Sequence, residues 1–333
     1  MPRGYTPAVI TSSVTSSAFP SSVTPGHTPV LLDETLEALA PRPDGRYLDA
    51  TVGGGGHAAA LLERAGPGGL LLGLDRDRST LGIARSRLAP VGDRASLMHG
   101  AFGDLGHYLN AVGWSRIDGV LFDLGFSSIQ LDSPGRGFSF QQDGLLDMRL
   151  DPTAPIPTAR DLLATLPEQE LADLLFRYGE EPLARRIARE VVRRRAHGSV
   201  STTSELRALV CAVSGGRHGR ATDPATRTFQ ALRIAVNDEL GQLAAALPQA
   251  ISALGPSGRI AVITFHSLED RIVKQHLATA AAGCICPPDL PECRCGHQPV
   301  VSLLWRKPRT PSRQEVARNP RSRSAKLRAA VKL

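Results

Sequence analysis

The stretch R-Y-L-D-A-T-V-G-G-G-G-H, residues 46–57, decides the fold of this chain. It consists of a short apolar segment ending in an acid, four consecutive glycines, and the start of a helical pattern that continues over residues 58–64. Glycine tolerates positive φ and lets a ligand lie against bare backbone. Where such a loop opens a helix, free N–H groups and the helix dipole favour an anionic or electron-rich group. The stretch therefore predicts a nucleotide-type cofactor at the end of the first strand of a doubly wound α/β sheet.

Two classes of cofactor are consistent with this loop. Gly53, Gly55 and Ala58 satisfy the spacing G-x-G-x-x-G/A of dinucleotide enzymes, which is a weak pattern when it stands alone. Asp49 favours the other class, because the spacing D-x-x-x-G-x-G resembles the first motif of S-adenosylmethionine-dependent methyltransferases of the Rossmann-like class. Asp75 closes a second apolar strand, where an acid accepts from both ribose hydroxyls. A glycine-rich turn without a ligand is the alternative, and the joint occurrence of the loop and the second acid argues against it.

Length, apolar runs and cysteines bound the class of protein. The 333 residues suggest about two domains, and no apolar run reaches the roughly 20 residues of a membrane span. The N-terminus has no continuous apolar core of the kind that a secretory signal requires. Four of the five cysteines fall within residues 284–295, which argues against a disulfide framework. We expect a cytoplasmic protein without a membrane-spanning segment.

The positive charge is concentrated near the C-terminus. Residues 306–333 contain ten Lys or Arg and one Glu, whereas the whole chain has a net charge of +7. A second basic run, with six arginines, lies on a helical pattern over residues 183–197. We interpret 306–333 as a basic tail and expect an acidic macromolecule, nucleic acid first, as partner. A solvated tail that only aids solubility is the alternative.

Hydrophobic patterning divides the rest of the chain. Residues 1–26 are rich in Ser, Thr and Pro and are predicted to be disordered. Residues 27–128 read as alternating strands and helices of a parallel sheet, which resumes at 258–265 and spans 241–305. Between them, 129–240 shows an irregular segment and then helical periodicity alone, including one predicted helix over about 224–247. We therefore expect a Rossmann-like domain, 27–128 and 241–305, with a helical substrate-recognition domain inserted over 129–240.

Further motifs run in order from residue 27 to the C-terminus. They are H-T-P-V-L-L-D-E (27–34), G-G-G-G-H (53–57), L-D-R-D (74–77), D-L-G-F-S-S (123–128) with Gln130, R-G-F-S-F (136–140), L-D-M-R-L-D-P (146–152), T-R-T-F-Q-A-L-R-I (226–234), F-H-S-L-E-D-R-I-V-K (265–274) and N-P-R-S-R-S (319–324). In these motifs the chain resembles the bacterial 16S ribosomal RNA (cytosine-N4)-methyltransferase H family. Phe126 and Leu145 depart from the family's pattern, in which Val and Pro are usual, and neither position is a polar group that the chemistry requires.

The resemblance implies both a fold and a reaction. The fold is that of class I S-adenosylmethionine-dependent methyltransferases, Rossmann-like, with an inserted helical domain. The reaction is methyl transfer from S-adenosylmethionine to the exocyclic N4 amine of a cytosine in the decoding centre of 16S rRNA, with the small ribosomal subunit as partner. The residues that the resemblance places around the cofactor are Gly55, Gly56, His57, Asp75, Phe102, Asp123 and Gln130.

Catalytic and substrate-binding roles follow as hypotheses. The cytosine N4 lone pair is delocalised into the ring, so the enzyme needs in-line positioning and an acceptor at the amine. We expect Asp123 to be that acceptor, although it can instead serve only the cofactor. Phe126 or Phe138 would stack on the extruded base. His266 is interpreted as a substrate-side or structural residue, and Arg136 as a phosphate contact, with solvated or ion-paired roles as the alternative.

The cysteine-rich segment C-I-C-P-P-D-L-P-E-C-R-C requires a separate interpretation. It places Cys284, Cys286, Cys293 and Cys295 as two C-x-C pairs, and His297 follows as a spare ligand. Four thiolates in a polar loop can enclose a tetrahedral Zn²⁺, although C-x-C is tighter than the usual spacing. Free thiols are the alternative, and methyl transfer itself needs no metal.

Other functions remain as alternatives at this point. One is a methyltransferase that acts on another nucleic-acid base or on a protein. Another is a cofactor-binding ribosome-assembly factor whose catalysis is secondary. A dehydrogenase is a more distant alternative, which titration with S-adenosylmethionine against NAD would test.

Overall fold

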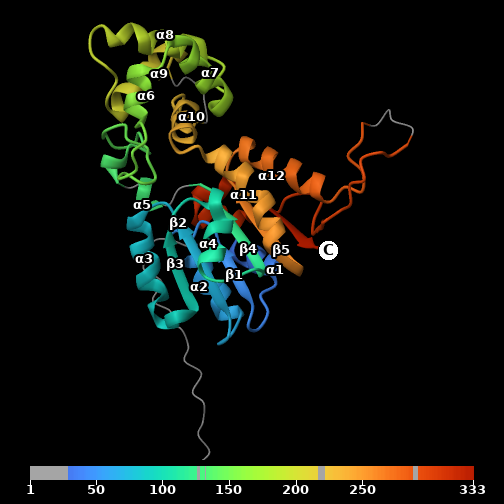
Figure 1. The fold of residues 1–333 in the computed structure, drawn as a ribbon. Coiled ribbons are helices and arrows are strands. Elements are labelled where there is room, and N and C mark those ends of the chain that lie inside the picture. Colours follow the sequence, from blue (N-terminus) through green and yellow to red (C-terminus); the bar gives the residue numbers. More distant parts are fainter. Residues whose placement is uncertain (1–28, 126–127, 132, 217–221, 288–291) are drawn as a thin grey trace, which may run out of the picture.

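A single seven-stranded sheet forms the body of the molecule (Figure 1). The computed structural model describes residues 29–125, 128–131, 133–216, 222–287 and 292–333. Along the sheet the strands are β3 (Ala95–His99), β2 (Leu70–Asp75), β1 (Arg46–Asp49), β4 (Ile117–Asp123), β5 (Leu254–Thr264), β7 (Lys326–Lys332) and β6 (Val301–Leu303). The first five are parallel, and β7 pairs antiparallel with both β5 and β6. This arrangement confirms the predicted Rossmann-like α/β fold. The predicted disordered N-terminal segment, 1–26, lies outside the described residues.

Helices cover both faces of the sheet, because neighbouring strand residues point to opposite sides. Tyr47 and Leu71 belong to one buried cluster, and Leu48 and Leu72 belong to the other. The first face is covered by α1 (Leu32–Leu39), α2 (Gly56–Arg64) and α3 (Arg78–Leu88). The second face is covered by α4 (Leu105–Ala111), α11 (Glu239–Ala253) and α12 (Ser267–Ala280). Strands that are buried on both faces explain the near-continuous apolar runs in the sequence.

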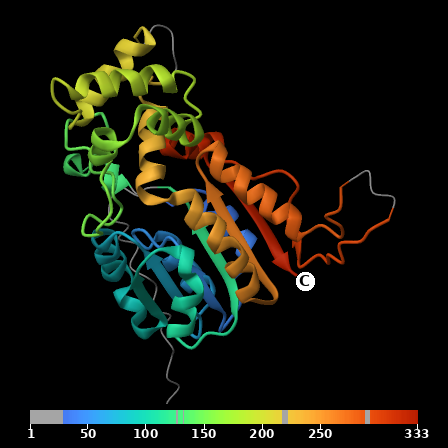
Figure 2. The same ribbon diagram turned by 45° about the horizontal axis from the view of Figure 1, so that its top comes forward.

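A helical insertion follows β4 and has a hydrophobic core of its own. Its helices are α5 (Ser128–Leu131), α6 (Ala159–Thr165), α7 (Glu168–Gly179), α8 (Ala184–Arg195), α9 (Thr203–Ser214) and α10 (Thr226–Asn237). Buried residues of this cluster run from Phe138 to Val236 and are separate from both clusters of the sheet. Figures 1 and 2 show the insertion at one end of the sheet. Capping boxes at Thr158 and Thr202 begin α6 and α9.

The long helix predicted over about 224–247 is wrong. The chain breaks at Asp238, whose φ of 49° and ψ of 41° are left-handed, and α10 and α11 lie on either side of it. The hydrophobic periodicity continues across the break, so the pattern of apolar residues does not indicate it. The apolar face of the helical pattern changes its packing partner at Asp238, because Val236 is buried in the core of the insertion and Leu243 in a core of the sheet. The structural change therefore falls at residue 238, close to the predicted boundary at 240.

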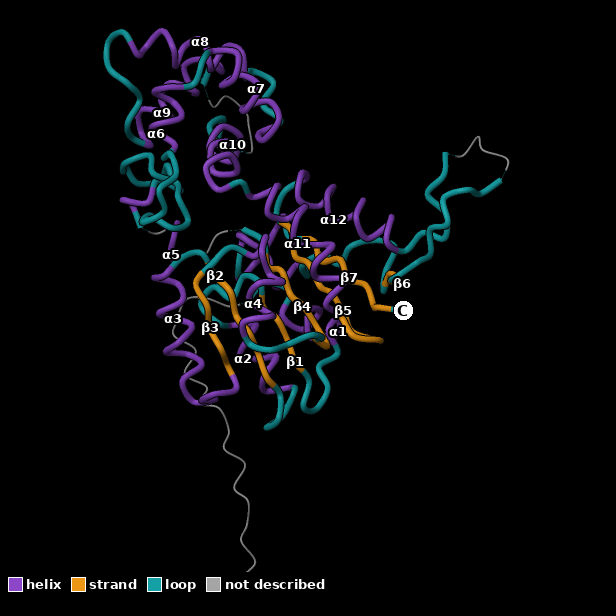
Figure 3. Tube along the Cα trace, viewed as in Figure 1, coloured by secondary structure: helices purple, strands orange, loops and turns teal. Residues whose placement is uncertain are grey.

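The interpretation of 306–333 as a separate basic tail is also wrong. Within it, α13 (Arg313–Arg318) is followed by β7, in which Leu327 and Ala330 are fully buried. Arg328 and Lys326 donate to the carboxylate of Asp270, at 2.6 and 3.2 Å. Lys326, Arg328 and Lys332 lie at alternate positions on one face of β7, and the first two pair with the buried carboxylate of Asp270, so the segment can enter the sheet with these cations paired. Figure 3 shows β7 between β5 and β6.

Polar contacts hold the insertion to the body. Arg76 Nη1 donates to the Asn237 carbonyl at 2.6 Å, and His99 Nε2 lies 3.2 Å from Asp151 Oδ2. On the other side, Arg271 pairs with Glu180 at 2.8 Å. None of the helices in the described part of the chain combines the length and apolar character needed to cross a membrane.

Candidate active site at the carboxyl edge of the sheet

The glycine loop joins the end of β1 to the start of α2. Gly53 and Gly55 have φ of 52° and 77°, a region that other residues disfavour. A Cβ on Gly55 would lie 3.3 Å from the Cα of Ala84 in α3, and a Cβ on Gly56 would lie 2.5 Å from Cγ of Pro29. The loop therefore needs glycine at these positions for its own conformation and packing, and it leads directly into the N-terminus of α2.

Three acids end the neighbouring strands β1, β2 and β4 around this loop. Asp49 is 1% exposed, and its Oδ1 accepts a hydrogen bond from the N–H of Thr51 at 3.2 Å. Asp75 Oδ2 accepts from the N–H of Gly53 at 2.9 Å and so fixes the loop. Asp123 donates its N–H to Thr51 Oγ1 at 2.6 Å, while its own buried Oδ1 has no hydrogen-bond partner among the described residues. A buried oxygen without a hydrogen-bond donor lowers the stability of the fold, unless a ligand donates a hydrogen bond to it.

Burial raises the pKa of all three carboxyl groups. The pKa of Asp49 rises to about 7, through burial and then the charge of Asp75. That of Asp75 rises to about 6, because burial outweighs the hydrogen bonds it accepts. The pKa of Asp123 rises to about 8, through burial and then the charges of Asp49 and Glu269. Opposite charge restores the ionised form of a carboxyl group, so this edge favours a cationic group such as a sulfonium or an ammonium.

Asp77, which we did not predict as a site residue, connects this edge to the insertion. Its Oδ2 accepts hydrogen bonds from Gln130 Nε2 and from Arg136 Nη1, both at 2.9 Å. Burial alone would raise the pKa of Asp77, but the hydrogen bonds it accepts and the Arg136 charge bring that pKa below its ordinary value. Arg136 also donates to the carbonyls of Arg149 and Leu150, at 3.0 and 2.9 Å. Gln130 and Arg136 thus hold α3 and the insertion together, and the only sign in the sequence was the second acid of L-D-R-D.

His57 and Phe102 were predicted to line the cofactor pocket. His57, in the first turn of α2, is buried, and its Nε2 lies 3.6 Å from Asp123 Oδ2. Phe102 follows β3 and meets Phe122 of β4 edge to face, with ring centroids 5.7 Å apart. It packs against the core while part of it stays accessible. The structure therefore brings the loop, His57 and Asp123 together and places Phe102 where a neighbouring strand ends.

Of the two aromatic residues predicted to stack on the base, the structure describes only Phe138. Phe138 is only 7% exposed, packs in the core of the insertion, and has the Arg136 Cζ atom 5.6 Å from its ring centroid. Its predicted stacking role is therefore wrong in this conformation, because both the core and the guanidinium cover the ring. Phe126 lies outside the described residues.

His266 belongs to a buried polar network at the end of β5. Its Nδ1 accepts from the N–H of Glu269 at 3.4 Å, while Glu269 Oε2 accepts from the N–H of Phe265 at 2.8 Å, so the pair caps α12. His266 Nε2 lies 3.0 Å from Glu269 Oε1. Glu239, at the start of α11, lies beside them and pairs with Arg233 at 2.8 Å. Arg233 and Glu239 balance each other, so we interpret the group as an ion-pair network. Neither Glu239 nor Glu269 was predicted from the sequence as a site residue, although Glu269 lies three residues after His266, as a capping box requires.

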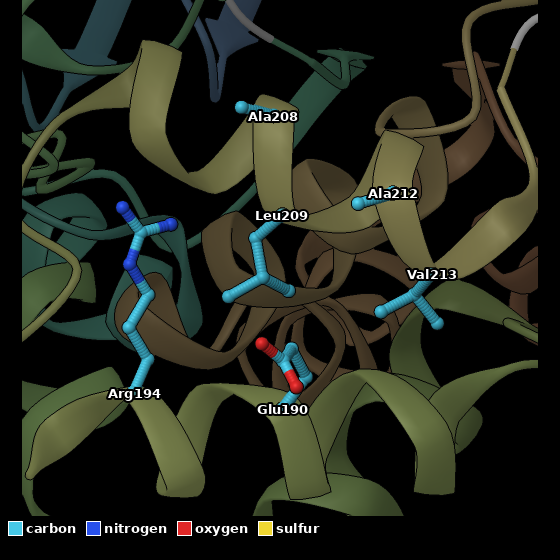
Figure 4. Close-up of a pocket in the computed structure, with 6 residues that line it drawn as sticks. All are labelled: Glu190, Arg194, Ala208, Leu209, Ala212 and Val213. Carbon is cyan, nitrogen blue, oxygen red and sulfur yellow. The ribbon is translucent and has the colours of Figure 1, made fainter.

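Two further features lie away from this edge. The four clustered cysteines occupy the loop between α12 and β6. A pocket with a volume of about 350 Å³ lies between α8 and α9, and none of the predicted site residues lines it (Figure 4). Its lining residues are Glu190, Arg194, Ala208, Leu209, Ala212 and Val213.

Comparison with known proteins adds a family to this geometry. The model of the MraW methylase family matches residues 24–333. The chain is 54% identical over 310 residues to the Ribosomal RNA small subunit methyltransferase H of Nitratidesulfovibrio vulgaris (strain Miyazaki F), covering 92% of this chain and 86% of that protein. Proteins of the same name from Thermomicrobium roseum and Heliobacterium modesticaldum are 52% and 50% identical, over 307 and 309 residues. Each alignment covers 92% of this chain, with 94% and 98% of the respective relative.

Proposed function

This chain belongs to the MraW methylase family and is a methyltransferase, and from that premise we propose that it methylates small-subunit ribosomal RNA with S-adenosylmethionine as donor. We further propose that the acceptor is the exocyclic N4 amine of a cytosine in the decoding centre of 16S rRNA. The observation that carries the proposal is the identity of 50–54%, over 92% of this chain, to relatives named as small-subunit ribosomal RNA methyltransferases. The choice of the cytosine N4 amine rests on the resemblance of the sequence motifs alone. The expected partner is the small ribosomal subunit.

The residues at the carboxyl edge fit S-adenosylmethionine. Gly53 and Gly55 hold the loop in a left-handed conformation that other residues disfavour, and the raised pKa values of Asp49 and Asp123 favour a cationic ligand. Asp75 already accepts from two backbone N–H groups, but a carboxylate has about four acceptor positions and can also bind ribose hydroxyls. S-adenosylmethionine would supply a methyl group carried on a positively charged sulfur. The partly exposed ring of Phe102 is the proposed contact for the adenine.

Asp123 is the proposed acceptor for the substrate amine. Its Oδ1 is buried and without a partner in the described structure, so a donor such as the N4–H of cytosine would relieve an energetic cost. A neighbouring cation lowers the pKa of a carboxyl group, so Asp123 ionises when the donor binds and can accept that hydrogen bond. Methyl transfer moves the positive charge to N4, which then releases a proton. A carboxylate with a raised pKa is suited to receive it.

Basic side chains of the insertion are the proposed contacts to the RNA backbone. Arg185 and Arg186 of α8 are exposed, and neither forms an ion pair with another residue that the structure describes. Arg193 pairs with Glu190 at 2.6 Å, and Arg195 donates to two backbone carbonyls. Part of the basic run therefore stabilises the insertion itself. Fewer than the six arginines of residues 183–197 then remain for phosphate contacts, so RNA binding should weaken less steeply with salt concentration than it would with six such contacts.

Mass spectrometry of rRNA from a deletion strain tests the function. We expect N4-methylcytosine to disappear from small-subunit RNA and to return with a plasmid that carries the wild-type gene or Glu37→Gln, an exposed change on α1. Asp123→Asn should not restore it. If another base or a protein loses its methyl group instead, the proposed substrate is wrong. If Asp123→Asn restores growth and subunit assembly as fully as the wild type while the mark stays absent, the protein acts chiefly as an assembly factor.

A further inference from the structure

The loop between α12 and β6 projects from the body of the molecule and carries four cysteines (Figures 1 and 3). We propose that Cys284, Cys286, Cys293 and Cys295 bind one structural Zn²⁺ through four thiolates. This loop lies away from the carboxyl edge of the sheet, and the zinc site does not depend on the reaction proposed above. It would give this loop a fixed conformation that its own packing does not supply.

The sulfur positions match a tetrahedral metal site. All four Sγ atoms lie within 4.8 Å of one another, including 3.6 Å between Cys293 and Cys295 and 3.9 Å between Cys295 and Cys284. Four sulfurs at the usual Zn–S distance of about 2.3 Å in a tetrahedron are ~3.8 Å apart. A disulfide would bring two of them to ~2.05 Å. The spacing is therefore that of ligands around a common centre, and all four cysteines are free thiols in this structure.

Backbone N–H groups are directed at the same sulfurs. Such bonds satisfy metal-bound thiolates and offset their negative charge, which four thiolates and one Zn²⁺ leave at −2. The N–H of Cys286 donates to Cys284 Sγ at 3.4 Å, and the N–H of Arg294 donates to Cys286 Sγ at 3.5 Å. Cys295 Sγ accepts from the N–H groups of Ile285 and His297, both at 3.5 Å. The acceptors are thus arranged as ligands whose orientation the loop backbone fixes.

The loop has little else to hold it together. Ile285 is 52% exposed, and among the described residues of 283–298 no backbone–backbone hydrogen bond is found outside regular structure. Loops of this length without secondary structure are uncommon unless something orders them. His297 Nε2 lies 2.9 Å from the carbonyl of Thr279, which anchors the loop to α12 and engages the nitrogen that the sequence suggested as a spare ligand. The four sulfurs are then the remaining centre of organisation.

Metal analysis of the purified full-length protein tests the site. We expect one zinc per chain, and its loss in the double variant Cys284→Ser/Cys293→Ser. The matched control is Cys211→Ser, because Cys211 lies in α9 and outside the cluster; it should keep the metal. Replacement by Co²⁺ should give the intense visible absorption of tetrahedral cobalt and the near-ultraviolet bands of thiolate ligation in the wild type and the control alone.

A second measurement keeps the test independent of how the variants fold. Adding a chelator to the wild-type protein should increase proteolytic cleavage within 283–298 and leave the melting temperature of the body within about 1 °C, since the loop lies outside the sheet and insertion clusters. The proposal is overturned if the reduced, zinc-equilibrated protein binds no metal, or if all four thiols stay reactive in its presence. It is equally overturned if the native protein has lost four hydrogens to two disulfides, or if Cys211→Ser removes the metal as the double variant does.

Discussion

Replacing Asp123 with asparagine should stabilise the protein without its cofactor while weakening cofactor binding. The pKa of Asp123 is raised from 3.8 to about 8 by burial and by the charges of Asp49 and Glu269. At pH 7 the group is ionised in the unfolded chain but largely protonated in the folded chain, so folding must take up a proton. A gap of about 3 pH units between 3.8 and 7 corresponds to a cost of ~4 kcal/mol at most.

The expected effect is smaller than this upper limit. The Asp123 side chain is a quarter exposed, and neighbouring acids share the shift, so we expect a gain of about 1–2 kcal/mol in the free energy of unfolding. For a chain of this size, that corresponds to a rise of roughly 2–4 °C in melting temperature. Added S-adenosylmethionine should stabilise the wild type by ~2.7 kcal/mol at a hundredfold excess over its Kd, and the variant by clearly less. The order of the two melting temperatures should therefore reverse with ligand.

Thermal unfolding followed by fluorescence between pH 4 and pH 8, with and without the ligand, measures both effects. The gain of the variant should vanish below pH 4, where the carboxyl group is protonated in both states, and grow as the pH rises toward 8. Glu37→Gln, an exposed change on α1, should stay within about 0.5 kcal/mol of the wild type throughout. A ligand-free variant that melts below the wild type at pH 7, or a gain that persists unchanged at pH 4, would refute the reasoning.

Three other predictions concern the same edge and its supports. Affinity for S-adenosylmethionine, measured by calorimetry, should increase from pH 6 to pH 8 with release of protons, because the pKa values of about 6 to 8 at the strand ends must fall when a cation binds; a flat profile would contradict this. Gly56→Ala should lower the free energy of unfolding by ~1–3 kcal/mol in urea, because its Cβ would lie 2.5 Å from Pro29 Cγ, whereas Gly54→Ala makes an ordinary 3.7 Å contact and should cost under ~1 kcal/mol. Asn237→Ala should lower the free energy of unfolding by ~2–3 kcal/mol and speed hydrogen exchange of the Leu150 amide, because the buried Asn237 Oδ1 accepts a hydrogen bond from that N–H at 2.8 Å. An unchanged exchange rate at Leu150 would show that this hydrogen bond does not protect the amide.

Local patterning in the sequence was enough to predict most of the sheet. A tetraglycine loop between a strand and a helix has few other uses, and the apolar runs around residues 70, 117 and 258 indicated buried parallel strands. The helical pattern over residues 183–197 likewise predicted a helix close to the observed bounds of α8. These features depend on neighbouring residues and on burial alone, and both can be inferred from the order of residues in the sequence.

Contacts between distant segments were decided only by the folded chain. The meeting of Asp77 with Gln130 and Arg136 depends on how the insertion returns to α3, and nothing in either segment specifies that distance. The break at Asp238 leaves the helical period intact, so only the change of packing partner reveals it. Local dihedral preference and burial are properties of a stretch of sequence. The entry of a basic segment into the sheet as β7 and the convergence of four sulfurs are instead set by which surfaces meet when the chain closes on itself.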